Sequence, residues 1–255
     1  MQFALVAFAL FISSFAVLAE QITTQYGSLL GQKNNNSQIF SFKGIPFAAP
    51  PVGELRWQPP QPVRAWQGVR DATTFAPRAM QNPIYSDMQF RSQEVSEDSL
   101  YLNVWTPKTS QSAKLPVLLY FHGGGFIAGS GDEKRYDGAS MAQKGIVVVT
   151  ANYRLGVFGF FAHEGLSKQT DYHGSGNYGL MDQQAALKCV AENIQQFGGD
   201  PKRITIAGES AGSISVSALM VAPSAKPYIA GAIGESGSIV GPPLDPLTLK
   251  DAEQY

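Results

Sequence analysis

The pentapeptide GESAG at residues 208–212 places Ser210 between two glycines that are each two residues away. An apolar, β-branched run at residues 203–207 precedes it and predicts a buried strand, while residues 213–220 predict a helix. A serine in a tight turn between a strand and a helix forms a nucleophile elbow, where flanking glycines let the backbone cross closely. Ser210 is therefore the candidate nucleophile, and an ordinary glycine-rich turn is the alternative.

A second glycine-rich motif, HGGG at residues 122–125, follows an apolar run at residues 116–121 that predicts another buried strand. Attack of a serine on an ester creates an oxyanion, which N–H donors must stabilise, and glycines expose such donors. Residues 123–128 also fit the dinucleotide-binding pattern G-x-G-x-x-A. That pattern requires an acidic residue about 20 positions further on, but residues 138–163 contain no Asp or Glu. No Gly-Lys-Ser/Thr follows the glycines, so an oxyanion loop is favoured over a nucleotide-binding loop.

The elements around these motifs predict an α/β protein. Residues 100–105 alternate like a half-buried strand, residues 108–114 predict a hairpin-like loop, and residues 145–150 predict a further buried strand. Residues 178–197 show helical spacing of apolar side chains and end at a glycine pair. Buried strands separated by helices predict a mostly parallel central sheet with helices on both faces. Residues 44–65 carry six of the 16 prolines and predict an ordered surface segment without helix.

The charge balance and the cysteine content of the chain limit the kinds of binding partner that are expected. The 255 residues include 19 Lys and Arg against 20 Asp and Glu, without a long basic run, so nucleic acid and anionic membranes are not expected partners. A single cysteine, Cys189, excludes an internal disulfide and a cysteine-rich zinc site. On its apolar helix face Cys189 is expected to be a buried small residue and not a nucleophile. The expected partner is a small molecule, and the oligomeric state stays open.

The first 19 residues predict a signal peptide. They form an apolar stretch that ends in Val-Leu-Ala, although no Lys or Arg occurs in the n-region. A membrane-spanning or amphipathic helix is the alternative and would need a longer uninterrupted apolar run. We therefore expect a secreted, periplasmic or extracellular protein, with residues 20–255 in a single domain.

Six ordered segments together resemble the type-B carboxylesterases, a family that includes the cholinesterases and has the α/β-hydrolase fold. They are KGIPFAAPPVGELRW (43–57), SEDSLYLNVWTP (96–107), FHGGGFIAGS (121–130), NYRLGVFGF (152–160), GNYGLMDQQAAL (176–187) and FGGDPKRITIAGESAG (197–212). The resemblance implies hydrolysis of a small-molecule ester through an acyl-enzyme, without cofactor or metal. It implies that Ser210 is the nucleophile and that the N–H groups of Gly124, Gly125 and Ala211 form the oxyanion hole. Glu209 would organise buried polar groups beside the nucleophile.

Other features of the resemblance concern residues outside the catalytic motifs. Related proteins place a disulfide where this chain has Ala79 and Ser99, so the intervening segment must be held by packing and hydrogen bonds. In cholinesterases that segment carries a tryptophan that stacks on a quaternary ammonium, but residues 80–98 contain no Trp. Tyr85 and Phe90 could replace it only weakly, so a neutral ester is the expected substrate.

The resemblance also implies two structural ion pairs, Arg56 with Glu97 and Arg154 with Asp182. The tetrapeptide at residues 234–237 imitates the elbow without its second glycine, and it is expected to end the next strand near the active-site rim.

The triad of this fold runs in the order Ser, acid, His, but His122, His163 and His173 all precede Ser210. His122 is expected in the oxyanion loop and the other two in surface loops. Because family members are roughly twice this length, we expect an N-terminal part of a longer protein, with the triad acid and histidine not in this chain. Alone, such a part would be nearly inactive, with one sheet edge open. A non-catalytic binding or adhesion protein and a degenerate truncated product are the alternatives, and retention of Ser210 with its glycines favours the enzyme.

Overall fold

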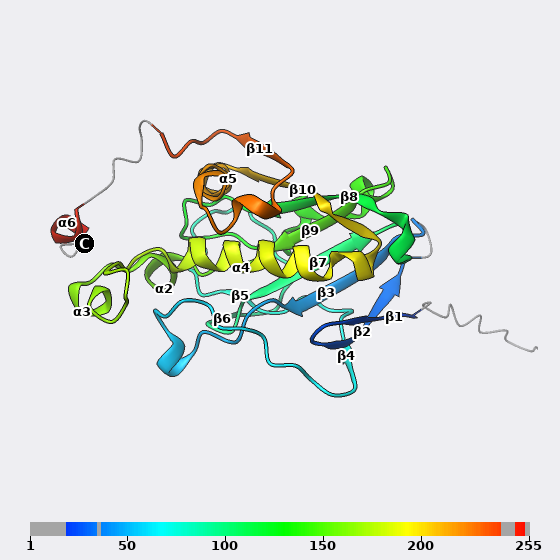
Figure 1. Ribbon diagram of the computed structural model, residues 1–255, viewed down its shortest axis with the longest axis horizontal. Helices are drawn as coiled ribbons and strands as arrows, with labels where there is room; N and C mark the ends of the chain where they lie inside the picture. The colour runs from blue at the N-terminus through cyan, green and yellow to red at the C-terminus, as the bar shows by residue number, and fades with distance from the viewer. Residues whose placement is uncertain (1–18, 35–36, 241–247, 253–255) are drawn as a thin grey trace, which may run out of the picture.

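The computed structural model describes residues 19–34, 37–240 and 248–252 (Figure 1). Within them, nine strands form one sheet in the order β1-β2-β3-β7-β9-β8-β10-β11, with β4 paired to β2. A separate pair, β5 and β6, forms a small two-stranded sheet. The strands are β1 (Ala19–Thr24), β2 (Gly27–Lys33), β3 (Phe40–Pro46), β4 (Val69–Asp71), β5 (Arg78–Ala79), β6 (Val95–Ser96), β7 (Tyr101–Thr106), β8 (Leu115–Phe121), β9 (Val147–Ala151), β10 (Gly199–Glu209) and β11 (Gly231–Glu235).

The sheet has an antiparallel half and a parallel half. Strands β1, β2, β3 and β7 pair antiparallel, and β7 also runs antiparallel to β9. Strands β9, β8, β10 and β11 pair parallel to one another. Because parallel strands end at the same edge, the loops after β8, β10 and β11 meet there. The α/β-hydrolase architecture is confirmed, and its parallel strands belong to the half that carries the candidate motifs.

The hairpin expected at residues 108–114 is wrong. This segment does connect β7 to β8, but β9 lies between them and pairs with both. A hairpin requires its two strands to be neighbours, and which strands become neighbours is decided by backbone hydrogen bonds between segments that are far apart in the sequence. The short polar connection alone could not reveal the later insertion of β9.

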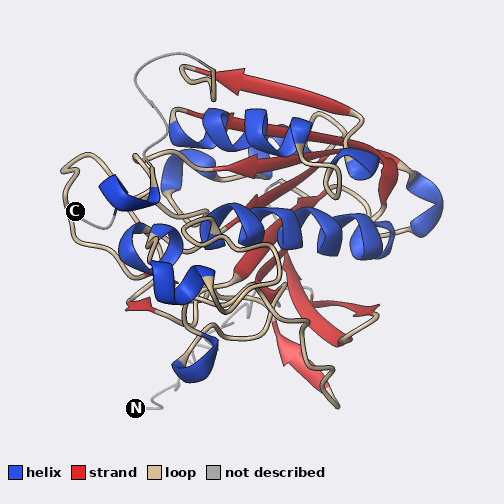
Figure 2. Ribbon diagram, turned by 60° about the vertical axis from the view of Figure 1, so that its left-hand side comes forward, coloured by secondary structure: helices blue, strands red, loops and turns tan. Residues whose placement is uncertain are grey.

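Helices cover both faces of the sheet (Figure 2). The two longest, α4 (Tyr178–Asn193) and α5 (Ala211–Val221), lie on one face and pack on β10. The short helix α1 (Ala139–Ala142) packs with Trp105 and Val148 on the other face. The remaining helices are α2 (Gly156–Phe160), α3 (Glu164–Ser167) and α6 (Leu249–Ala252), with 3-10 turns η1 (Gly53–Leu55), η2 (Gln111–Ala113), η3 (Lys134–Tyr136), η4 (Ile194–Phe197) and η5 (Lys226–Tyr228).

The main core fixes the parallel strands beneath α4 and α5. It contains Leu119, Val149 and Ile206 from the sheet, packed with Leu187 and Val216 from the helices. Burial of each such side chain stabilises the fold by about 1.5–3 kcal/mol. This packing holds the ends of β8 and β10 rigidly with respect to each other.

Several expectations about single segments are confirmed. The helix expected at residues 178–197 continues from α4 into η4 and ends at Gly198, whose φ is 80°. The proline-rich segment at 44–65 is ordered as expected but is only partly a surface segment without helix, because Ile45, Phe47 and Ala48 are buried at the end of β3 and beyond it, and residues 53–55 form η1. Cys189 is buried and unpaired, and burial raises the pKa of its thiol to about 12, as expected for a packing residue.

The signal peptide is predicted at residues 1–19. Of these residues, only Ala19 lies in the described part of the chain. Ala19 begins β1 and pairs with Gln32. No helix within the described ranges has the length and apolar character needed to cross a bilayer.

Candidate active site

Ser210 occupies the turn between β10 and α5, where a nucleophile elbow was expected. Its backbone lies at φ 55° and ψ −121°, and it is the N-cap residue of α5. A positive φ is strained for any residue with a Cβ, and it persists only where the surroundings hold it. Part of that support comes from β11, because the Ser210 N–H donates a hydrogen bond of 2.8 Å to the carbonyl oxygen of Glu235.

The two glycines of the motif are required by close backbone approach. A Cβ on Gly208 would lie 2.4 Å from the carbonyl carbon of Gly212, and a Cβ on Gly212 would lie 2.1 Å from the carbonyl oxygen of Phe121. Neither position therefore accepts a side chain. The same contact brings the start of α5 against the end of β8, where the HGGG segment begins.

The HGGG segment lies directly against Ser210. A Cβ on Gly123 would be 3.2 Å from the Ser210 Cβ and 2.7 Å from the carbonyl oxygen of Glu209. Gly124 and Gly125 have φ values of 104° and 63°, which glycine adopts readily. The structure therefore brings the two motifs together, although they are far apart in the sequence.

The expected oxyanion donors remain available for a ligand. The Gly124 carbonyl accepts from the N–H groups of Ile127 and Ala128, both at 3.1 Å. Among the described residues, no hydrogen bond uses the N–H of Gly124, Gly125 or Ala211 as donor. The first N–H groups of a helix have no partner within the helix, which applies to Ala211 at the start of α5.

His122 begins the HGGG segment and is poorly suited to act as a base. Its ring is fully buried and stacks on Tyr153 with ring centres 4.4 Å apart, and its Nδ1 lies 2.8 Å from the carbonyl oxygen of Gly123. Burial lowers the pKa of His122 to about 4. The neutral ring therefore donates from Nδ1 and braces the loop.

The other two histidines lie in the loop region after β9. His163 is the N-cap residue of α3, and its Nδ1 accepts a hydrogen bond of 3.0 Å from the Gly165 N–H. His173 lies in a turn with φ 50°. Within the described ranges, none of the three histidines is hydrogen-bonded to Ser210.

Glu209 lies near two half-buried phenols, those of Tyr120 and Tyr136. Its Oε2 would be 2.9 Å from a Cβ on Gly123. The rings of Tyr120 and Tyr136 lie 4.8 Å apart, and burial raises the pKa of both phenols, with Glu209 adding to each shift. The phenols therefore stay neutral, and Glu209 has the polar surroundings that the resemblance implied.

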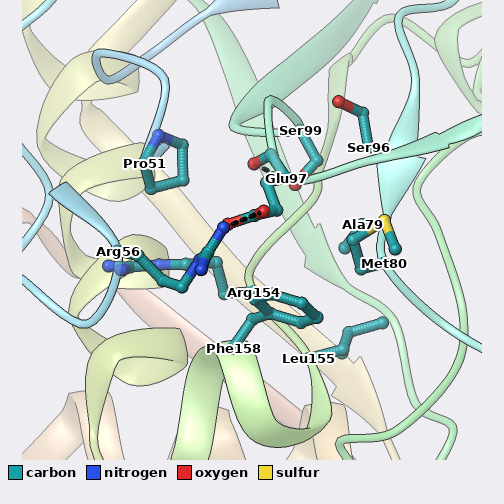
Figure 3. Close-up of a pocket in the computed structure, with 10 residues that line it drawn as sticks. All are labelled: Pro51, Arg56, Ala79, Met80, Ser96, Glu97, Ser99, Arg154, Leu155 and Phe158. Atoms are coloured by element: carbon teal, nitrogen blue, oxygen red, sulfur yellow. Dashed lines mark hydrogen bonds and ion pairs between the residues drawn. The ribbon is translucent and has the colours of Figure 1, made fainter. Parts of the chain in front are cut away.

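The two ion pairs implied by the resemblance are confirmed. Arg154 and Asp182 are buried and joined by two side-chain hydrogen bonds of 2.8 Å. Arg56 donates to Glu97 at 2.6 and 2.5 Å, across a cavity of about 10 Å³ that Ala79 and Ser99 also line (Figure 3). The first pair ties the residues before α2 to α4, and the second ties the segment after Ala79 to the residue that follows η1; neither pair includes an elbow residue.

The segment between residues 79 and 99 forms one side of the site. The Tyr85 hydroxyl would be 3.6 Å from a Cβ on Gly125, so this ring lies at the oxyanion loop. Phe90 instead packs against the Arg78 guanidinium at 4.8 Å. An open cleft of about 380 Å³ runs alongside the loop, and all its lining side chains are uncharged: Met80, Gln81, Asn82, Ile84, Ile127, Leu155, Gly156, Val157 and Phe158.

Three contacts around the site could not be found from motif spacing. Gln81 binds the backbone of Gly129, Tyr153 binds that of His122, and Glu235 binds that of Ser210. Tyr153 falls within one of the family-like segments, but nothing in its local sequence indicates its partner. In the described part of the chain, no group of three or more His, Cys, Asp or Glu side chains could hold a metal ion.

Comparison with known proteins identifies the protein family to which the chain belongs. Residues 19–250 match the model of the carboxylesterase family, and the chain belongs to that family. It is 48% identical over 219 residues to a fumonisin B1 esterase of Sphingopyxis macrogoltabida and 45% identical over 223 residues to a para-nitrobenzyl esterase of Bacillus subtilis. These matches cover 86% and 85% of this chain but only 40% and 43% of the two relatives.

Solved structures agree with this assignment. A carboxylesterase of Geobacillus stearothermophilus superimposes with a TM-score of 0.77 at 48% identity. The match covers 86% of this chain and 44% of that protein. The chain thus spans less than half the length of these relatives, and it contains the elbow and the HGGG loop within the matched part.

Proposed function

We propose that this chain supplies the nucleophile and the oxyanion hole of a serine carboxylesterase. One observation carries the proposal: the Ser210 elbow and the glycines of the HGGG loop lie in contact, with Gly123 placed against the Ser210 Cβ. A serine at a strained strand-to-helix turn, beside unused backbone donors, is suited to attack a carbonyl carbon. Membership of the carboxylesterase family supports ester hydrolysis as the reaction.

In the proposed reaction, Ser210 Oγ attacks the ester carbonyl and transfers its proton to a base. The carbonyl oxygen becomes an oxyanion, which accepts hydrogen bonds from the N–H groups of Gly124, Gly125 and Ala211. Collapse of this intermediate expels the alcohol, which takes up the proton, and leaves an acyl group on Ser210. Water then repeats the sequence and releases the carboxylic acid. Each oxyanion donor contributes roughly 3–4 kcal/mol to such a transition state.

The base in this proposal is a histidine from outside the described residues, together with its acidic partner. The described histidines favour this assignment, because none of them is hydrogen-bonded to Ser210 and burial makes the His122 ring a weak base. Asp or Glu side chains alone would be weak bases for a serine proton.

The proposed substrate is a neutral carboxylic ester. The cleft beside the oxyanion loop is lined by uncharged side chains, including Ile84 and Ile127, so it offers no counter-charge to a cationic alcohol group. The Tyr85 hydroxyl lies close to Gly125, and a single exposed phenol gives a weak cation site. We also propose that the protein is exported by its first 19 residues.

The deciding experiment uses the protein from its native source. Its intact mass and its turnover of p-nitrophenyl butyrate are measured before and after a fluorophosphonate, and the labelled peptide is sequenced. We expect turnover that the reagent abolishes, with the label on Ser210. In the same full-length protein produced recombinantly, the Ser210→Ala variant should lose both turnover and labelling. The Ser236→Ala variant should keep the label on Ser210.

Ser236 is a stringent control because it has a similar positive φ of 58° only one residue beyond β11. Label on Ser236, or turnover that survives Ser210→Ala, would contradict the assignment of the nucleophile. A native protein without turnover and without label would instead favour a binding protein on the same fold.

A further inference from the structure

Gln81 binds the backbone of Gly129, 48 residues further along the chain, with both ends of its carboxamide. Its Nε2 donates to the carbonyl oxygen of Gly129 at 2.8 Å, and its Oε1 accepts from the Gly129 N–H at 2.9 Å. Nε2 also donates to the carbonyl oxygen of Ala79 at 3.0 Å. If the amide oxygen and nitrogen were exchanged, the oxygen would face two carbonyl oxygens and the nitrogen would face an N–H group. The backbone therefore fixes the orientation of this amide.

Gly129 in turn packs against the beginning of the HGGG segment. Its φ is 114°, and a Cβ there would lie 2.4 Å from His122 Nδ1 and 2.6 Å from the carbonyl oxygen of Gly123. At such close packing, a shift of Gly129 must be accompanied by a shift of the imidazole or of the Gly123 carbonyl. The position of Gly129 is therefore coupled to the first residues of the loop.

The turn between these contacts is compact. The Ala128 N–H donates to the Gly124 carbonyl at 3.1 Å. The Ala128 carbonyl oxygen lies 2.1 Å from the place of a Cβ on Gly124. The peptide planes of Gly124 and Gly125 thus depend on where both ends of the turn are held. His122 and Tyr153 hold the first end, and Gln81 holds the second.

We propose that Gln81, although it also lines the cleft, is a positioning residue for the oxyanion hole and acts through Gly129. The inference rests on the proposed esterase function. Oxyanion donors are effective when they are already held in place before the reaction. Loss of the Gln81 carboxamide should therefore weaken stabilisation of the transition state and leave binding of the ester unchanged.

The test compares Gln81→Met with Gln93→Met in the full-length native protein. Gln93 belongs to the same segment, its side chain is exposed, and no hydrogen bond to it occurs among the described residues. We expect Gln81→Met to lower kcat for p-nitrophenyl butyrate at least about tenfold, with KM within about twofold. The Ki of butyl trifluoromethyl ketone, whose adduct with serine carries an oxyanion, should rise by the same factor as kcat falls. Gln93→Met should change none of these values.

Gln81→Glu provides a second variant with nearly unchanged volume. The ionised carboxylate keeps the acceptor for the Gly129 N–H and loses both donor bonds, so kcat should fall at neutral pH. Protonation restores a donor, so the activity relative to the unmodified protein should recover as the pH is lowered.

The outcomes separate the inference from the proposed function. If the unmodified protein is active and Gln81→Met matches Gln93→Met in kcat and in Ki, the positioning role is wrong and the esterase proposal stands. An active Gln81→Met whose KM rises while kcat and Ki stay constant would also overturn it. If the unmodified protein neither turns over the ester nor reacts with a fluorophosphonate, both proposals fail together.

Discussion

The Tyr153 hydroxyl donates a 2.8 Å hydrogen bond to the carbonyl oxygen of His122, while its ring stacks on the His122 imidazole. One side chain thus holds both the backbone and the ring of the residue that opens the oxyanion loop. Tyr153 follows β9 and His122 follows β8, so the contact joins the ends of two neighbouring parallel strands. The loop geometry therefore depends on the sheet beneath it.

Tyr153→Phe removes this donor and keeps the ring. The buried carbonyl oxygen of His122 is then left without its partner, which should lower the free energy of unfolding by roughly 1–3 kcal/mol. We also expect a lower kcat, because the loop is less firmly held. Urea unfolding and steady-state kinetics of the native protein measure both effects. Tyr172→Phe, at an exposed ring, is the matched control. Equal unfolding midpoints for the two variants would contradict the prediction.

The buried His122 should make the protein acid-sensitive. Its pKa is about 4 in the folded protein, against 6.5 for an exposed imidazole. Between these values the unfolded chain binds a proton that the folded protein does not, so stability is present above the unfolded pKa and falls as the pH drops through this window. The full difference is roughly 3 kcal/mol, of which about 2 kcal/mol is lost between pH 7 and pH 5.

Urea unfolding of the native protein at these two pH values tests this assignment, with His122→Gln as the control. The variant cannot gain the proton, so its loss of unfolding free energy between pH 7 and pH 5 should be smaller by about 2 kcal/mol. An equal loss in both proteins would show that other groups carry the acid sensitivity.

Replacing one partner of the buried pair Arg154–Asp182 should lower the free energy of unfolding far more than replacing one partner of an exposed pair. Asp182→Asn leaves the guanidinium charge buried without its counter-ion, which typically costs about 3–5 kcal/mol. Replacing both residues, as in Arg154→Met with Asp182→Leu, should cost less because no charge is stranded. Glu164→Gln, at the exposed pair with Lys168, should leave the urea midpoint nearly unchanged. A double variant that is less stable than Asp182→Asn would contradict the charge argument.

Ala79 and Ser99 are both buried and line one cavity, at the positions where related proteins carry a disulfide. The double variant Ala79→Cys with Ser99→Cys should therefore form a disulfide upon oxidation. Closing a loop of roughly 20 residues should raise the free energy of unfolding by about 3 kcal/mol. Thiol titration and urea unfolding of the oxidised and reduced forms measure this. Two thiols that remain free after oxidation would show that the backbone here has departed from that geometry.

Local signals in the sequence determined much of the fold. The strand, turn and helix around Ser210 were predictable because the apolar runs and the glycine spacing lie within about 20 residues, a range in which backbone sterics and amphipathic patterns decide conformation. For the same reason the start of α4 and both ends of β8 were predicted to within one residue, whereas the predicted helix end at residue 197 is the end of η4.

The resemblance supplied what local patterns could not. It paired Arg56 with Glu97 and Arg154 with Asp182, and the structure confirms both pairs. It also implied that Gly124, Gly125 and Ala211 act together. The local sequence around these residues does not distinguish them from other glycine-rich turns.

Tertiary structure alone decided the contacts between distant segments. The insertion of β9 between β7 and β8 depends on the backbone hydrogen bonds that β9 makes with both strands, which a short loop sequence does not encode. The support of the loop by Gln81 and Tyr153, and of Ser210 by Glu235, uses backbone groups that every residue possesses. Such groups carry no signature in the sequence, so their partners become defined only when the sheet brings the strand ends together.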